Sequence, residues 1–200
     1  MNREIEMKLP LTQDQYQSLF EKIQEPPFTK PIHLIKSDTY FSRYDTPEER
    51  KQACKENKEP RVIRIRTDEC TGQEAPDTQN QSQKKSYFCI KNKSIQNGIE
   101  FNDEHESLIE DPEVLKLFFK VAGYKEYFHK SKDAYSTHYK DFHLELEKVN
   151  GLPYVEIEVT TSTLPADTVR QNIEDFVKEL GLDPKTRDSR SWMEIIHSHI

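Results

Sequence analysis

Apolar and polar residues alternate along much of this 200-residue chain, a pattern typical of β-strands with two different faces. In residues 3–9, Ile5, Met7 and Leu9 fall on one face, and the residues between them are charged. The same alternation recurs to the end of the chain. It predicts strands at residues 3–9, 33–43, 61–66, 87–93, 99–108, 126–140, 141–149 and 153–160.

Helical spacing is limited to a few segments. Thr12 is expected to cap a helix that runs to about Gln24, and Asp111 is expected to cap a second that ends at Gly123. Two further helices are predicted at residues 167–180 and 189–197, the second with the only tryptophan of the chain. The polar stretch 45–60 predicts a loop or a short exposed helix, and residues 68–83 predict a mobile polar loop.

The predicted strands carry charge of both signs on one face. An ordinary two-layer sheet turns its polar face to water, whereas a closed barrel can be apolar outside, against helices, and polar within. We therefore predict an α+β protein, with an eight-stranded antiparallel β-barrel (tunnel) of polar interior, flanked by a few α-helices. No stretch has the character of a linker, so residues 1–200 are expected to form a single domain.

Composition narrows the choice of partners. Hydrophobic residues are 34% and charged residues 32% of the chain, which fits charge placed inside the fold. A net charge of -7 argues against a nucleic-acid partner. The three cysteines support neither a disulfide framework nor a zinc site.

Without a membrane-length apolar run or an apolar leader, we expect a cytoplasmic protein with no membrane partner. A homodimer stays open, with residues 141–149 as half of its interface.

Two pairs of carboxylates have the spacing of metal ligands. In Glu4-x-Glu6 and in Glu156-x-Glu158 the two side chains point the same way, with Cα atoms about 6.5–7 Å apart. If the two strands are neighbours, several oxygens converge, as Mg²⁺ or Mn²⁺ requires. For either pair alone, a solvated strand face is the alternative explanation.

Basic residues recur on single faces of the predicted strands and are suited to phosphate oxygens, because arginine offers a planar fork and lysine a point charge. They are Lys8, Arg64, Arg66, Lys91, Lys93, Lys130 and Lys132. Further acids would hold these cations in place, or supply another metal ligand or base. These acids are Glu100, Glu104, Glu106, Glu145 and Glu147. Exterior solubilising charge is the alternative for both sets.

Several of these segments match, in order, the motifs of a known family. Residues 4–8 (EIEMK) resemble its E-x-E-x-K signature, and other segments resemble its later strands and closing helix. Those segments are 38–41 (DTYF), 63–66 (IRIR), 88–91 (FCIK), 130–132 (KSK), 145–147 (ELE), 154–158 (YVEIE) and 191–194 (SWME). The chain thus resembles the CYTH superfamily, or triphosphate tunnel metalloenzymes, in its class IV adenylate cyclase-like and thiamine triphosphatase-like branch. Lys132 replaces the usual arginine and Glu147 an expected aspartate.

The resemblance implies an eight-stranded antiparallel tunnel that uses Mg²⁺ or Mn²⁺ on a triphosphate. It implies metal binding by Glu4, Glu6, Glu156 and Glu158. Phosphate binding would fall to the seven basic residues named above. Tyr40 with Lys91 or Lys93 is a candidate base-like dyad, and Glu147 a candidate ligand or base.

The function then has three alternatives. The favoured one is a metal-dependent phosphohydrolase acting on inorganic triphosphate, a nucleoside triphosphate or thiamine triphosphate, because no pocket for a base can be identified in the sequence. The second is a class IV adenylate cyclase that forms cyclic AMP and pyrophosphate from ATP. The third is a non-catalytic module that binds polyphosphate or a nucleotide.

Overall fold

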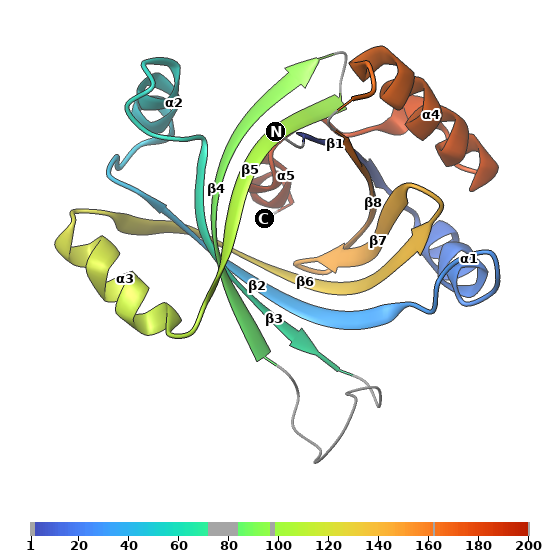
Figure 1. The fold of residues 1–200 in the computed structure, drawn as a ribbon, viewed down its shortest axis with the longest axis horizontal. Coiled ribbons are helices and arrows are strands. Elements are labelled where there is room, and N and C mark those ends of the chain that lie inside the picture. Colours follow the sequence, from blue (N-terminus) through green and yellow to red (C-terminus); the bar gives the residue numbers. More distant parts are fainter. Residues whose placement is uncertain (1–2, 72–83, 97–98, 162, 200) are drawn as a thin grey trace. The chain divides into compact units, whose positions relative to one another are not determined.

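The computed structural model describes residues 3–71, 84–96, 99–161 and 163–199. Its strands form a closed antiparallel barrel in the hydrogen-bonded order β1-β5-β4-β3-β2-β6-β7-β8 (Figure 1). The predicted α+β barrel is confirmed. The strands are β1 (Arg3–Pro10), β2 (Ile32–Ser42), β3 (Val62–Cys70), β4 (Lys84–Gln96), β5 (Ile99–Ile109), β6 (Lys125–Tyr139), β7 (Phe142–Val149) and β8 (Leu152–Thr161).

Two strands, β3 and β4, are longer than the alternation predicts. β3 continues to Cys70, so the prediction of a loop from residue 68 is wrong for residues 68–70; residues 72–83 lie outside the described part of the chain. In the β3–β4 register Asp68 lies opposite Lys85, and Glu69 opposite Lys84. Opposite charges across a strand pair are favourable, which extends this polar end of the hairpin.

Two of the described helices begin directly after the capping residues that the sequence predicts, Thr12 and Asp111. The described helices are α1 (Gln13–Ile23), α2 (Pro47–Lys55), α3 (Pro112–Val121), α4 (Ala166–Glu179) and α5 (Trp192–His197), with a short 3-10 turn, η1, at Pro184–Thr186. Thr12 and Asp111 cap α1 and α3. The stretch 45–60 contains the short-helix alternative, α2. The last helix starts three residues later than predicted, because Ser191 caps it and accepts from the Glu194 backbone. None of the helices that the structure describes has the length and apolar character needed to cross a membrane.

The described residues fall into two compact units, each assembled from separate stretches of chain. The first comprises Met1–Leu34, Ser94–Asn102 and Lys132–Ile200, and the second comprises Ile35–Lys93 and Asp103–Ser131. A single domain over residues 1–200 stays a prediction. The two units are described in turn.

In the first unit, the apolar face of the sheet packs against helices. Ile5, Met7 and Leu9 of β1 belong to one buried cluster with residues of α1 and α4 such as Leu19 and Ile173. Their neighbours in the strand lie on the opposite face, because successive side chains of a strand point to opposite sides. The packing thus leaves the charged face of β1 turned away from both helices.

The location predicted for a dimer interface is wrong. Leu144, Leu146 and Val149 of β7 have no exposed surface, and β7 pairs on both edges, with β6 and with β8. The alternation in residues 141–149 comes from burial inside the chain itself.

The second unit repeats the same arrangement with different residues. Phe41, Ile63 and Ile65 form a buried cluster with Phe119 of α3. Arg64 and Arg66 alternate with these apolar residues along β3 and so occupy the other face. The apolar face is covered by α1 and α4 in the first unit and by α3 in the second, and the charged face carries the candidate chemistry.

Candidate functional site

Three glutamates of the first unit converge at one point. Glu4, Glu6 and Glu158 each offer one oxygen, and these oxygens lie within 4.8 Å of one another. The β1–β8 register brings them together, because it sets Glu6 directly opposite Glu158. Hard carboxylate oxygens at this spacing are the donors that Mg²⁺ and Mn²⁺ prefer. We refer to these residues as the carboxylate trio.

A buried amide next to the trio also fits a metal site. Asn102 Nδ2 donates to Glu6 Oε2 at 3.0 Å. Within the described ranges, Asn102 Oδ1 is buried without a hydrogen-bond partner. A buried acceptor without a partner is costly, and a hydrated cation held by the neighbouring carboxylates would satisfy it. Both the donor set and this amide fit a divalent ion.

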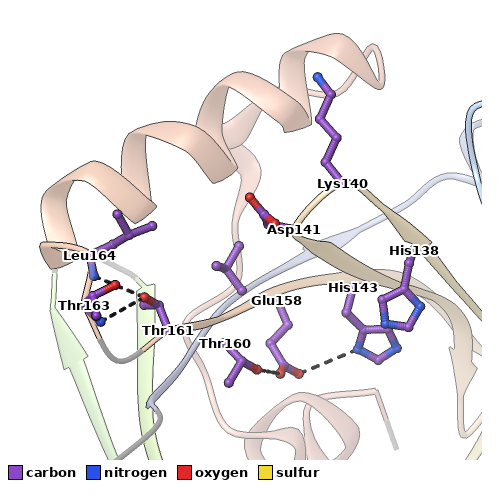
Figure 2. Close-up of a pocket in the computed structure, with 10 residues that line it drawn as sticks. His138, Lys140, Asp141, His143, Glu158, Thr160, Thr161, Thr163 and Leu164 are labelled. Atoms are coloured by element: carbon purple, nitrogen blue, oxygen red, sulfur yellow. Dashed lines mark hydrogen bonds and ion pairs between the residues drawn. The ribbon is translucent and has the colours of Figure 1, made fainter.

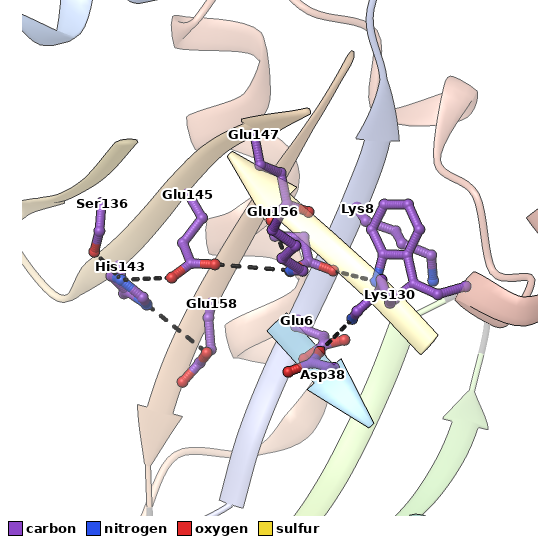
Figure 3. A network of polar contacts seen from close by, with 12 residues as sticks. Glu6, Lys8, Asp38, Lys130, Ser136, His143, Glu145, Glu147, Glu156 and Glu158 are labelled. Atoms are coloured by element: carbon purple, nitrogen blue, oxygen red, sulfur yellow. Dashed lines mark hydrogen bonds and ion pairs between the residues drawn. The ribbon is translucent and has the colours of Figure 1, made fainter. Parts of the chain in front are cut away.

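A second group of carboxylates surrounds a lysine. Lys132 Nζ lies 2.6 Å from an oxygen of Glu147, 2.6 Å from Glu156 and 3.8 Å from Glu145. Figure 3 shows these three glutamates close together on β7 and β8. Glu156 also accepts from Trp192 Nε1 at 3.0 Å, which ties α5 to this group. A cationic ammonium therefore already occupies this second group.

The structure thus divides the four predicted metal ligands. It brings Glu4, Glu6 and Glu158 together but places Glu156 in the group around Lys132. Glu156 and Glu158 lie on the same face of β8, yet their neighbours across the sheet differ. The metal-binding role of all four residues stays a prediction, and the trio is the set that geometry favours.

Lys8 is held in a buried ion pair. Its Nζ lies 2.6 Å from Glu100 Oε1, and both side chains are almost fully buried. The Trp192 ring lies 5.8 Å from the same ammonium group, within cation–π range. The prediction that acids of β5 hold the basic side chains in place is confirmed for this pair.

In the second unit, Asp38 is the centre of a cluster of cations. Arg66 donates to both Asp38 oxygens, at 2.8 Å and 3.1 Å. Lys130 Nζ lies 3.1 Å and Arg64 Nη1 3.7 Å from Asp38 Oδ2. Burial alone would raise the pKa of Asp38, but the charges of Arg66, Lys130 and Arg64 outweigh burial and hold that pKa well below its usual value.

Glu104 holds the other cations of this unit. It lies 2.8 Å from Lys91 Nζ and 3.2 Å from Arg64 Nη2, and it accepts from Cys89 Sγ. Burial is the main cause that raises the pKa of Cys89 to about 12, so the thiol stays protonated. The role of β5 acids as partners of cations is therefore confirmed here too.

Tyr40 and Lys91, which form the proposed base-like dyad, contact two different carboxylates. Lys91 pairs with Glu104, whereas the Tyr40 hydroxyl donates to Asp38 at 3.4 Å and the Tyr40 ring lies 5.8 Å from Lys130 Nζ. Lys93 is half-buried near the end of the β3–β4 pairing, and its carbonyl accepts from Arg61. The dyad stays a prediction.

The sequence of this chain matches the model of a known protein family. The family model described as the CYTH domain matches residues 2–192. The chain belongs to the CYTH family. Among curated proteins, none matches this sequence.

Solved structures agree with the CYTH fold. The PH1819 protein from Pyrococcus horikoshii OT3 has a TM-score of 0.75 at 20% identity, covering 98% of this chain and 99% of that one. HpAC1 from Hippeastrum, described as a candidate adenylyl cyclase with a dominant triphosphatase activity, has a TM-score of 0.65 at 18% identity, covering 100% and 96%. A candidate adenylate cyclase from Vibrio parahaemolyticus has a TM-score of 0.67 at 16% identity, covering 97% of each chain. At these identities the likeness shows the fold.

A cavity of about 520 Å³ opens beside the trio of this CYTH chain. Figure 2 shows Glu158 in its wall, with His143 turned toward it. His143 Nδ1 lies 3.8 Å from Glu158 Oε2, and Ser136 Oγ lies 2.8 Å from His143 Nε2. The ring of His138 stacks on that of His143. A polar cavity with two imidazole rings thus adjoins a candidate metal ligand.

Sequence reasoning left two of these residues without a role. Asp38 appeared only as the first residue of the DTYF segment, although its parity with Tyr40 on a strand is a signal that would place it on the charged face. His143 has no signal in the sequence. Its position follows from the β7–β8 register, which sets it opposite Glu158.

Glu147 of the CYTH chain has a pKa that its surroundings raise. It is fully buried, and burial together with the charge of Glu156 raises its pKa to about 8, while Lys132 acts in the opposite direction. The raised pKa favours the protonated form of Glu147. Three ionised carboxylates around one ammonium would leave excess buried negative charge, and this proton reduces that excess.

Glu147→Gln is expected to raise the free energy of unfolding of the metal-free protein above that of the wild type at pH 8. At pH 5 the two proteins are expected to differ much less. A raised folded-state pKa contributes stability below the unfolded value of 4.5, and this contribution is lost as the pH rises toward about 8. Glutamine mimics the protonated acid, so the variant escapes the loss, which is on the order of 3 kcal/mol. Urea denaturation in EDTA across this pH range measures it. A variant whose stability follows that of the wild type at every pH would contradict the assignment.

Proposed function

We propose that this CYTH chain is a divalent-metal-dependent phosphohydrolase that acts on a triphosphate: inorganic triphosphate, a nucleoside triphosphate or thiamine triphosphate. The observation that carries the proposal is the carboxylate trio on the same strand face as buried cations. A purely structural charged face would be exposed to water, whereas Lys8, Arg64, Lys130 and Lys132 are buried. Membership of the CYTH family and the triphosphatase activity described for HpAC1 support it.

Mg²⁺ or Mn²⁺ is the proposed cofactor. Glu4, Glu6 and Glu158 would hold the ion, with Glu156 as the further ligand implied by the sequence. When bound, such an ion supplies positive charge that binds phosphate oxygens and stabilises the charge of the reacting phosphoryl group. The buried amide of Asn102 keeps Glu6 oriented through its hydrogen bond.

Each unit, taken by itself, holds cations that suit phosphate oxygens. In the first unit these are Lys8 and Lys132, and in the second they are Arg64, Arg66, Lys91 and Lys130, with Lys93 near the strand end. Each of the buried cations is held by a carboxylate before substrate arrives, so the groups are oriented in advance and need little reorganisation. A polyanion competes with those carboxylates for the same ammonium and guanidinium groups.

The proton-transfer roles are proposed for three side chains. Lys91 with Tyr40 is the proposed base, oriented by Glu104 and Asp38 respectively. Glu147, whose pKa is raised by burial and by Glu156, is the proposed acid or base of the first unit. Groups whose pKa values are shifted by burial and by charged neighbours are frequent at catalytic sites.

The cavity beside Glu158 favours a second candidate, a class IV type of adenylate cyclase. A cyclase requires room for a nucleoside, and about 520 Å³ next to a candidate metal ligand offers it. The stacked rings of His138 and His143 suit an aromatic base. On this reading the product would be cyclic AMP with pyrophosphate.

One assay on the purified chain decides between these functions. Tripolyphosphate, ATP, GTP and thiamine triphosphate are each supplied with Mg²⁺ or Mn²⁺, with EDTA as the control. We expect metal-dependent release of orthophosphate. Cyclic AMP plus pyrophosphate would establish the cyclase. Tight binding of tripolyphosphate without turnover under both metals would show a non-catalytic module and overturn the proposal.

A further inference from the structure

Helix α3 exposes an apolar stripe. Val114, Leu117, Phe118 and Val121 have the i, i+3, i+4, i+7 spacing of a single helix face. Their exposed fractions are 63%, 60%, 62% and 81%. Isolated exposed apolar residues are ordinary, but four on one face of a ten-residue helix form a contiguous surface. We call these four residues the α3 stripe.

The stripe is displayed on an anchored helix. The opposite side of α3 is fixed to the second unit, because Phe119 is buried with Phe41, Ile63 and Ile65, and Leu115 packs against that cluster. Asp111 accepts from two backbone N–H groups of the first turn. The helix cannot turn its stripe inward without giving up these contacts, so burial of the stripe requires another molecule.

Acidic residues lie at the start of α3, and basic residues lie further along it. Glu110, Asp111 and Glu113 lie at or before the first turn, whereas Lys116 lies near the middle of the helix and Lys120 in its last turn. Glu113 pairs with Lys116 within the helix. Among the described residues, no carboxylate forms an ion pair with Lys120. The helix surface is thus acidic at one end and basic at the other.

This pattern is complementary to itself in antiparallel orientation. If two α3 helices pack about a two-fold axis between Leu117 and Phe118, Val114 of each meets Val121 of the other. The same symmetry brings Glu113 of one copy beside Lys120 of the other, twice. Closed two-fold contacts are the commonest way in which soluble chains associate, and the antiparallel helix dipoles are also compatible.

We propose that the chain forms a two-fold symmetric homodimer through antiparallel packing of the α3 stripes, with two Glu113–Lys120 pairs between copies, one at each end of the contact. The partner is a second copy of this chain, because the apolar spacing and the charges match the same surface when inverted. The surface is separate from the residues of the proposed function.

A charge-reversal experiment tests both the interface and its orientation. Sedimentation velocity of the full chain over about 1 to 100 µM gives the dimer affinity. We expect Glu113→Lys and Lys120→Glu each to weaken the dimer about tenfold, because each places like charges together at both ends of the contact. The double variant restores opposite charges and is expected to recover the wild-type affinity.

A matched pair of substitutions tests the stripe itself. Val121→Glu places a charge at the most exposed position of the stripe and is expected to give a monomer with an unchanged melting temperature. Ile32→Glu alters an exposed apolar residue on β2, outside α3, and is expected to leave the dimer intact. A wild-type chain that is monomeric over the whole concentration range, or a double variant no tighter than its parents, would overturn the proposal.

Discussion

Glu158→Gln is expected to lower turnover of tripolyphosphate at least ~100-fold without lowering the melting temperature, a barrier increase of about 2.7 kcal/mol. Glutamine keeps the shape of glutamate and can still accept from Thr160 Oγ1, which lies 3.1 Å from Glu158. It removes one of three carboxylates whose oxygens lie within 4.8 Å of one another. Their mutual repulsion falls, so the fold loses nothing, while a charged metal ligand is lost. Steady-state kinetics with Mg²⁺ or Mn²⁺ and a thermal melt measure both effects.

Glu156→Gln is the matched control on the same strand. Glu156 faces Lys132 and Trp192 rather than the trio, so its substitution is expected to affect turnover less than Glu158→Gln does. Equal losses in the two variants would show that the two carboxylate groups act as one. Full turnover in Glu158→Gln would remove the trio from the reaction.

Asp38→Asn is expected to produce the largest loss of stability, about 3–5 kcal/mol at neutral pH. The carboxylate is almost fully buried and has Arg66, Lys130 and Arg64 around it. An amide has no charge to offset theirs, and breaking a buried ion pair leaves uncompensated charge. The midpoint of urea denaturation measures the loss. A loss below about 1 kcal/mol would mean that water reaches and solvates these cations.

The pH dependence of this loss has a definite sign. The folded-state pKa of Asp38 lies well below its usual 3.8, so its contribution is present above that value and disappears as the pH falls through the folded pKa. The difference between wild type and variant is therefore expected to shrink under strongly acidic conditions. Asp175→Asn is the control, because Asp175 forms an exposed pair with Lys178 and its loss is expected to have no measurable effect.

Tripolyphosphate without metal extends the test of Asp38. A polyanion that binds the cations released from Asp38 stabilises the folded state by mass action. We expect tripolyphosphate to raise the melting temperature of Asp38→Asn more than that of the wild type. An equal rise in both proteins would show that these cations do not bind phosphate.

Local sequence predicted the elements because their signals are short in range. Alternation in residues 3–9 marks β1, and the capping residues Thr12 and Asp111 mark the starts of α1 and α3. Charged residues such as Arg64 and Arg66 recur on one face of the strands. This alternation also indicated a barrel with a polar interior and with its apolar face packed against helices. These features depend on residues within a few positions of one another.

The sequence by itself determined the barrel class, the family resemblance and which faces carry charge, because periodicity and motif order are properties of the chain alone. Only the tertiary structure decided which charges meet. Glu156 and Glu158 share a face two residues apart, yet strand register and neighbouring strands send one to Lys132 and the other to Glu4 and Glu6. The central place of Asp38 and the contact of His143 with Glu158 were decided in the same way. Partners across a sheet come from distant segments, and a shift of one residue in register would exchange them.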